Sequence, residues 1–386
     1  MATHIEYTPS SSPNGEQQAV SFWVKRSELG TDQCILEARQ NSTNLSSIKF
    51  NTDDRIQIYS ENGGSTNVYV RPTRRFRDIN SWYHFVFAID TSQGTSSDRV
   101  KIYVNGVQET VMTTSTYPSS SYDGFWFGLS GIKSVIGRDN QGGGSEDFQG
   151  VLSHFHYARG NVYQASTFGS TDSTTGEWKI NTNPTVTYGA TGWFVLKDGN
   201  SVTDQSGNSN NFTVGSGTLT KTEDNPSNVF ATMNPVDSYW MSATYSNGNN
   251  KVVTQGSHRT SMAATLGASS GKYYYEVKFD ADTSGAGLVV GIDTKGASSC
   301  SVFNGSYCDE YTGRRTYAYG YYSSDGTVYN GGSSAGSYTS FSTGTIICVA
   351  LDLDNNKLYY RRNDSAWENS GDPTSGSTGT GAVSLN

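Results

Sequence analysis

Charged residues are scarce in this chain, and apolar residues are scarce as well. Only 16% of its 386 residues are Asp, Glu, Lys or Arg, against about 25% in an average protein, and 34% are hydrophobic. A disordered chain would combine low hydrophobicity with high net charge, but here the net charge is only -8 and 12% of the residues are aromatic. We therefore expect a folded protein of more than one domain.

Long apolar runs are also absent. No stretch approaches the ~18 residues of a membrane-spanning helix, and residues 1–18 lack the basic start and apolar core of an export signal. The sequence thus predicts a protein that is neither secreted through such a signal nor inserted in a membrane. The acidic balance argues against a nucleic-acid partner, because phosphate contacts need clustered cations. The one basic segment, 71–77, is interpreted as a solvated strand edge.

Cysteine is rare and scattered, which excludes a disulfide framework and a Cys-x-x-Cys zinc site. Cys34 and Cys348 lie in apolar segments and are expected to be inert core thiols. Cys300 and Cys308 flank a polar loop, where they could form a bridge or remain free thiols. The sequence leaves that alternative open.

Glycine, tyrosine and small polar residues fill the chain instead, with 43 Gly and 25 Tyr. Such a mixture suits short strands joined by tight turns, and it supplies few of the residues that favour helices. The run 82–90 is apolar on both faces, which predicts a central strand. Apolar residues alternate in 99–106, where Asn105-Gly106 predicts a hairpin turn. We therefore expect an all-β fold built from β-sandwiches.

The rest of the chain divides by its apolar density. Density falls over residues 161–239, although 191–196 and 211–214 are typical of short strands. Strong strand patterns return at 271–279 and in the hairpin 345–361. We therefore expect two β-sandwiches joined by a structured connector. The predicted boundaries are 1–165 for the first sandwich, 166–240 for the connector and 241–386 for the second sandwich.

Two histidines alternate with aromatic residues near the end of the first sandwich. His154 and His156 should share one face of a strand, where two imidazoles could bind zinc. Local spacing supplies no third ligand. We therefore interpret them as ordinary histidines on a strand face.

Several segments resemble known families. Four segments resemble the laminin G-like, concanavalin A-like jelly roll. They are Phe22-Trp23-Val24-Lys25, Trp82-Tyr83-His84-Phe85-Val86, Val100-Lys101-Ile102-Tyr103-Val104-Asn105-Gly106 and Phe148-Gln149-Gly150-Val151-Leu152-Ser153. Four later segments resemble a SPRY domain. They are Gly271-Lys272-Tyr273-Tyr274-Tyr275-Glu276-Val277, Val290-Gly291-Ile292, Tyr317-Ala318-Tyr319-Gly320 and residues 344–358. A SPRY domain normally continues through further strands after 357–361, whereas this segment is followed by a Gly/Ser/Thr stretch. The edge of the sheet is therefore left without a predicted partner.

The connector carries the resemblance that bears on biological context. Segments 167–176, 204–213 and 225–235 are similar to a linker shared by structural proteins of marine bacteriophages. The resemblance implies a virion protein that is made in the host cytoplasm and lies on the exterior of the particle.

Catalytic motifs are missing from the sequence. Glycoside cleavage by a sandwich of this class would need two carboxylates facing one groove, about 5–9.5 Å apart. Asp352 and Asp354 are close in sequence, but they lie where a hairpin turns and are expected to serve the turn. No nucleophile elbow, zinc-protease motif or phosphate loop occurs. We therefore expect a protein that is not an enzyme.

Two sets of residues are candidate binding sites. Laminin G-like domains often bind calcium at the rim of the sandwich. The resemblance therefore implies a calcium site formed by Asp139, Glu146 and Asp147. The alternative is that these residues form a solvated acidic loop without a metal. SPRY domains usually meet partners through loops at one end. The corresponding residues are Arg314, Arg315, Tyr317 and Tyr322. An Arg/Tyr mixture suits stacking on sugars or on protein, but exposed tyrosines could equally cover the sheet.

The sequence as a whole predicts a bacteriophage virion surface protein, a tail fibre or appendage component that acts as an adhesin. Its expected partners are other virion proteins, a host surface glycan and further copies of itself. The alternatives are a capsid decoration protein and a polysaccharide-degrading enzyme or its carbohydrate-binding module. Calcium is the one cofactor that the resemblance suggests.

Overall fold

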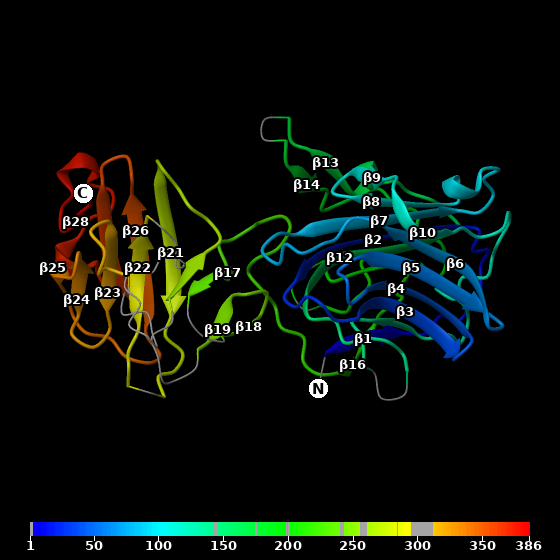
Figure 1. Ribbon diagram of the computed structural model, residues 1–386, viewed down its shortest axis with the longest axis horizontal. Helices are drawn as coiled ribbons and strands as arrows, with labels where there is room; N and C mark the ends of the chain where they lie inside the picture. Colours follow the sequence, from blue (N-terminus) through cyan, green and yellow to red (C-terminus); the bar gives the residue numbers. More distant parts are fainter. Residues whose placement is uncertain are drawn as a thin grey trace. The chain divides into compact units, whose positions relative to one another are not determined.

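The computed structural model describes residues 3–141, 145–173, 176–197, 199, 201–239, 243–254, 261–283, 285–294 and 312–386. Two compact units make up the chain, Met1–Phe230 with Ser246–Asn250 and Ala231–Tyr245 with Lys251–Asn386. Both units are built from β-strands, so the all-β prediction is confirmed (Figure 1). Over the described residues, no helix is long and apolar enough to cross a membrane. The domain boundaries that we placed at 165 and 240 stay predictions.

The first unit contains two large antiparallel sheets. In order across the first sheet, the strands are β10 (Met112–Thr116), β6 (Ser65–Pro72), β5 (Ile56–Asn62), β4 (Asn44–Phe50), β3 (Gln33–Asn41), β11 (Ser134–Ile136), β1 (His4–Tyr7) and β16 (Thr213–Ser216). In order across the second sheet, they are β15 (Trp193–Val195), β12 (Gly150–Arg159), β2 (Gln17–Arg26), β7 (Tyr83–Asp90), β8 (Val100–Val104) and β9 (Val107–Glu109). A short 3-10 helix, η1 (Ser96–Asp98), precedes β8.

Aromatic side chains from both sheets fill the space between them. Phe22 and Phe85 of the six-stranded sheet are fully buried, as is Phe50 of the eight-stranded sheet. The rings of Phe50 and Phe85 meet edge to face, with centroids 5.8 Å apart. Burying each such side chain stabilises the fold by about 1.5–3 kcal/mol. The first unit is therefore a β-sandwich with one continuous core.

The strands expected at 82–90 and 99–106 are present as β7 and β8, which pair with each other, and the predicted Asn-Gly turn joins β8 to β9. β7 lies between β2 and β8, as expected for a run that is apolar on both faces. The turn follows β8 at Asn105 and Gly106, which both have positive φ angles of 47° and 83°. Two consecutive positive φ angles define a type I′ turn, which favours Asn-Gly.

The connecting segment contributes strands to the first unit. The strands expected at 191–196 and 211–214 are present as β15 and β16, and they pair with β12 and β1. Between them, Asp204 is buried and its carboxylate accepts hydrogen bonds from the backbone of Phe194 at 2.8 Å and Asn210 at 2.9 Å. The turn formers of this segment thus fasten the loop to β15.

The outer face of the six-stranded sheet is covered by a short helix and a hairpin. These are α1 (Ala165–Phe168), β13 (Gly169–Thr171) and β14 (Trp178–Ile180). Phe168 packs on Val86 and Tyr103 of the sheet. A Cβ atom at Gly106 would lie 2.4 Å from the ring of Trp178, so only glycine fits beneath this indole. Figure 1 shows the hairpin beside β8 and β9.

The second unit is a smaller sandwich. Its first sheet has the order β21 (Lys272–Lys278), β26 (Ile346–Asp352), β27 (Lys357–Arg362) and β28 (Val383–Ser384). Its second sheet has the order β22 (Val289–Asp293), β23 (Ala318–Tyr322), β24 (Thr327–Asn330) and β25 (Ser333–Ser337). Two-stranded sheets are formed by β17 (Met233–Tyr239) with β20 (Ser261–Ala264) and by β18 (Thr244–Ser246) with β19 (Lys251–Val253). The 3-10 helices η2 (Glu368–Ser370) and η3 (Gly376–Thr378) precede β28.

Tyrosines join the two sheets of this unit. Tyr321 of β23 and Tyr360 of β27 are buried, with ring centroids 5.2 Å apart. The edge that lacked a predicted partner is paired by β28, where Val383 lies opposite Leu358. The Gly/Ser/Thr stretch therefore returns the chain to the sheet instead of leaving its edge open.

Cys34 and Cys348 lie in the core as expected, whereas the basic segment is not a strand edge, because it begins in β6, which pairs with both β5 and β10. Cys34 and Cys348 are buried free thiols, and burial raises the pKa of Cys34 well above its ordinary value. Cys300 and Cys308 lie outside the described residues. In the basic segment, Arg74 pairs with Glu109 at 3.1 Å and Arg77 pairs with Asp54 at 2.8 Å.

Candidate functional site

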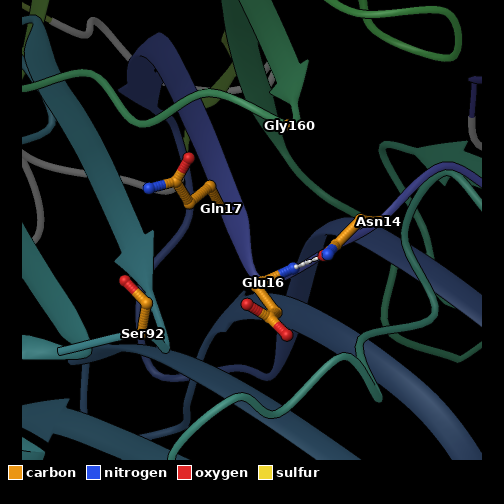
Figure 2. A pocket seen from close by; sticks show the side chains of 5 residues that line it. All are labelled: Asn14, Glu16, Gln17, Ser92 and Gly160. Atoms are coloured by element: carbon orange, nitrogen blue, oxygen red, sulfur yellow. Dashed lines mark hydrogen bonds between the residues drawn. The ribbon is translucent and has the colours of Figure 1, made fainter.

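A polar pocket of about 320 Å³ opens at one end of the six-stranded sheet. It forms where β2 begins and where β7 and β12 end (Figure 2). Its lining residues are Asn14, Glu16, Gln17, Ser92 and Gly160. The five residues supply carboxylate, amide and hydroxyl groups, together with the aliphatic carbons of the same side chains.

Backbone hydrogen bonds bring the three strand ends together. The amide of Gly160 donates to the carbonyl of Gln17 at 2.8 Å, and the amide of Thr91 donates to the carbonyl of Glu16 at 2.9 Å. The Glu16 amide donates to the side-chain oxygen of Asn14 at 2.7 Å, as Figure 2 shows. The position of the lining residues therefore follows from the register of the sheet.

The turn after β7 holds the other wall of the pocket. The Ser92 hydroxyl donates to one carboxylate oxygen of Asp90 at 2.6 Å, and the Gln93 amide donates to the other oxygen at 2.6 Å. Partial burial alone would raise the pKa of Asp90, but these hydrogen bonds outweigh it and lower that pKa. Asp90 therefore stays ionised and organises the turn.

The pocket suits a ligand that carries several hydroxyl groups. Glu16 offers a carboxylate acceptor, and Ser92 offers its hydroxyl oxygen, since its proton is donated to Asp90. Asn14 offers its amide N–H groups, since its oxygen accepts from Glu16, and Gln17 supplies a second amide. Glu16 is the one carboxylate among the lining residues, and the nearby Asp90 accepts hydrogen bonds from the side chains of Ser92, Gln93 and Gln17. Cleavage of a glycosidic bond by the usual mechanism needs two carboxylates facing the substrate.

The predicted Arg/Tyr set does not form one cluster. Arg314, Arg315 and Tyr317 precede β23, whereas Tyr322 is its last residue, and a five-residue strand separates its ends by roughly 13 Å. Arg315 pairs with Asp293. Tyr317 is 56% exposed.

The predicted calcium residues have separate partners. Glu146 lies 2.6 Å from the ammonium group of Lys49, and Asp147 pairs with Arg138 at 3.3 Å. Asp139 accepts a hydrogen bond from the backbone amide of Ser145 at 3.0 Å. As arranged, these carboxylates do not converge on one ion, and within the described ranges no three His, Cys, Asp or Glu residues do so. Calcium binding at this loop stays a prediction.

Histidines form a buried group beneath the hairpin of β13 and β14. Ser21 Oγ lies 2.9 Å from His84 Nε2, and the indole N–H of Trp178 donates to His84 Nδ1 at 3.0 Å. Because Nδ1 accepts, Nε2 carries the proton and donates to Ser21. His84 therefore cannot accept a proton from Ser21 in this arrangement, which opposes a role for the pair as nucleophile and base.

His154 and His156 share the outer face but do not alternate regularly. A β-bulge lies between Ser153 and His156, and His154 has a positive φ of 46°. The ring of His156 stacks on Phe194 and accepts or donates a hydrogen bond with Tyr188 Oη at 2.8 Å. Both histidines are thus packed in the sheet surface.

None of the residues that line the polar pocket was predicted from the sequence as a site residue. The available signal consisted of turn formers at Asn14-Gly15 and Ser92-Gln93-Gly94, which mark loops without indicating that they meet. Only the pairing of β2 with β7 and β12 brings these loops together.

Two family models match the chain. Residues 2–160 match the model described as the concanavalin A-like lectin/glucanases superfamily, and residues 272–371 match the SPRY domain. No curated protein matches the chain.

Similar solved structures cover parts of the chain. The heptameric SAP-like pentraxin from Limulus polyphemus is 17% identical over 42% of this chain and 72% of its own, with a TM-score of 0.31. Domain 4 of the extracellular arabinanase AbnA from Geobacillus stearothermophilus, solved with arabinotriose, is 18% identical over 40% of this chain and 66% of its own, with a TM-score of 0.29. Tailspike protein 2 of bacteriophage CBA120 is 9% identical over 43% of this chain and 25% of its own, with a TM-score of 0.31.

These structural similarities are too low to carry an argument about function. The two family matches agree with the sandwiches seen in the two units and with the motifs quoted from the sequence. The chain therefore contains a concanavalin A-like domain followed by a SPRY domain.

Proposed function

We propose that this chain is a glycan-binding protein without catalytic activity, carried on the outer surface of a bacteriophage particle as part of a tail fibre or appendage. The observation that carries glycan binding is the polar pocket at the end of the concanavalin A-like sandwich. Its mixture of donors and acceptors complements the hydroxyl groups of a saccharide.

Binding without turnover is supported by the charges of the pocket. The matched superfamily contains both lectins and glucanases by name, so the residues must distinguish them. Glu16 is the single carboxylate of the lining. A lone carboxylate can accept hydrogen bonds from sugar hydroxyls, but it cannot serve as acid and nucleophile together.

The virion context rests on the connector. Segments 167–176, 204–213 and 225–235 resemble a linker of marine bacteriophage structural proteins. Electron microscopy of intact particles labelled with an antibody against this chain tests the proposal. We expect label on the tail or its appendages. Label on the shell would indicate a capsid decoration protein, and unlabelled particles would contradict the virion context.

Replacing Glu16 by alanine is expected to weaken binding of at least one glycan by tenfold or more. A hydrogen bond to a charged group contributes about 1.5–3 kcal/mol, and each 1.4 kcal/mol is about tenfold in affinity. The measurement is binding of the purified protein to an array of bacterial envelope oligosaccharides. Glu28→Ala is the matched control, because Glu28 is exposed and follows the opposite end of β2. Equal binding by the wild type and Glu16→Ala to every glycan would refute the pocket as the site.

A further inference from the structure

A second surface with the character of a binding site lies on the outer face of the SPRY unit. Tyr274 of β21 and Arg361 of β27 point away from the core, and Trp367 follows β27. We call these three residues the aromatic platform. Tyr274 is 49% exposed although it is a large aromatic residue in the middle of a strand.

Contacts within the platform fix the orientation of its rings. The rings of Tyr274 and Trp367 meet edge to face with centroids 6.5 Å apart, and the guanidinium carbon of Arg361 lies 5.1 Å from the centroid of Trp367. Beneath them, the buried ring of Tyr359 meets Trp367 edge to face at 6.4 Å. Aromatic and cation contacts of this kind hold the rings in place before any ligand arrives.

The polar groups beside these rings are balanced in charge. Arg361 donates to the hydroxyl oxygen of Tyr274 at 3.4 Å, and that hydroxyl donates to the carboxylate of Glu276. On the same face, Lys272 pairs with Asp352 at 3.2 Å. One cation therefore accompanies each anion. Such a surface favours neither an acidic nor a basic ligand.

We propose that the aromatic platform binds a neutral saccharide ring. A pyranose presents C–H groups on its faces, which suit the exposed ring of Tyr274, and hydroxyl groups at its rim, which suit Arg361 and Glu276. This inference rests on the proposed glycan binding and adds a second site, located in the other unit of the chain.

The test uses the full chain carrying Glu16→Ala, so that the platform is measured without the polar pocket. The probes are neutral gluco-, galacto- and manno-oligosaccharides, and the readout is the dissociation constant from titration calorimetry. We expect the Glu16→Ala protein to bind at least one of these probes. Adding Tyr274→Ala or Trp367→Ala should weaken that binding at least tenfold. Because Tyr274 is exposed, the Tyr274→Ala protein should keep the melting temperature of its parent to within a few degrees.

Tyr273→Ala is the matched control. Tyr273 is 48% exposed but points to the opposite face of β21 from Tyr274, so its loss should leave the affinity unchanged. The inference is overturned if the Glu16→Ala protein binds none of the probes, if Tyr274→Ala binds like its parent, or if Tyr273→Ala is equally impaired. If the wild type binds a glycan and the Glu16→Ala protein does not, the proposed glycan binding is supported and the inference about the platform is wrong. Failure of the wild type to bind any glycan would remove both.

Discussion

Replacing Asp224 by alanine is expected to lower the free energy of unfolding of the first unit by about 3–5 kcal/mol. Lys25 and Asp224 form an ion pair at 2.8 Å, and each side chain is only 1% exposed. The indole N–H of Trp82 donates to the same carboxylate at 3.1 Å. Removing the carboxylate leaves a buried ammonium group without its counter-charge, which costs far more than the loss of a surface pair.

Urea unfolding followed by tryptophan fluorescence measures this effect. Glu223→Ala is the matched control, since Glu223 is the neighbouring residue and is exposed in a loose pair with Lys221. The double variant Lys25→Met with Asp224→Leu should recover much of the loss, because an apolar pair of similar volume needs no counter-charge. Equal stability of Asp224→Ala and Glu223→Ala would show that the segment around Asp224 is not fastened to the first unit as described.

Acidification from pH 6.5 to 4.5 is expected to destabilise the first unit by about 2–3 kcal/mol through His84 alone. Burial, with a smaller contribution from the neighbouring His154, lowers the pKa of His84 from 6.5 to about 3. Below pH 6.5, His84 becomes protonated in the unfolded chain but stays neutral in the folded chain. The stabilisation is therefore complete above pH 6.5 and is lost progressively as the pH falls toward 3.

The chosen pH range separates histidines from carboxylates. Asp53, Asp54 and Asp90 have lowered pKa values, because hydrogen bonds and cations outweigh the opposing effect of burial, so their stabilisation is lost only near and below pH 3.8. His156, whose pKa is also lowered by burial, adds to the slope. Urea unfolding at several pH values measures this slope of the free energy of unfolding against pH. His84→Gln should flatten the slope, and a wild type with constant stability over this range would contradict the buried, neutral state of His84.

The fold was predictable because its strongest signals are local. The alternating run before Asn105-Gly106 predicts the turn that joins β8 to β9, and the buried run that ends at Asp352 predicts a hairpin because turn-forming residues follow it. β28 was not predictable, because Val383 and Ser384 form a two-residue strand whose apolar pattern is too short to detect. Its pairing depends on tertiary contacts with β27.

The candidate sites were less predictable than the fold. The polar pocket joins turns that are separated by more than 70 residues, from Glu16 to Ser92, so spacing in the sequence could not relate them. The resemblance to SPRY domains suggested Tyr317 and Tyr322 as one group, but β23 places them at its two ends. Chemistry that depends on strand register cannot be derived from residue types alone.

Titration calorimetry of the purified chain with envelope oligosaccharides distinguishes binding of a glycan from its cleavage in one experiment. We expect heats that saturate at a fixed stoichiometry and then cease. A steady heat flow after saturation would reveal continued cleavage, and the absence of heat with every oligosaccharide would show that this chain does not recognise glycans.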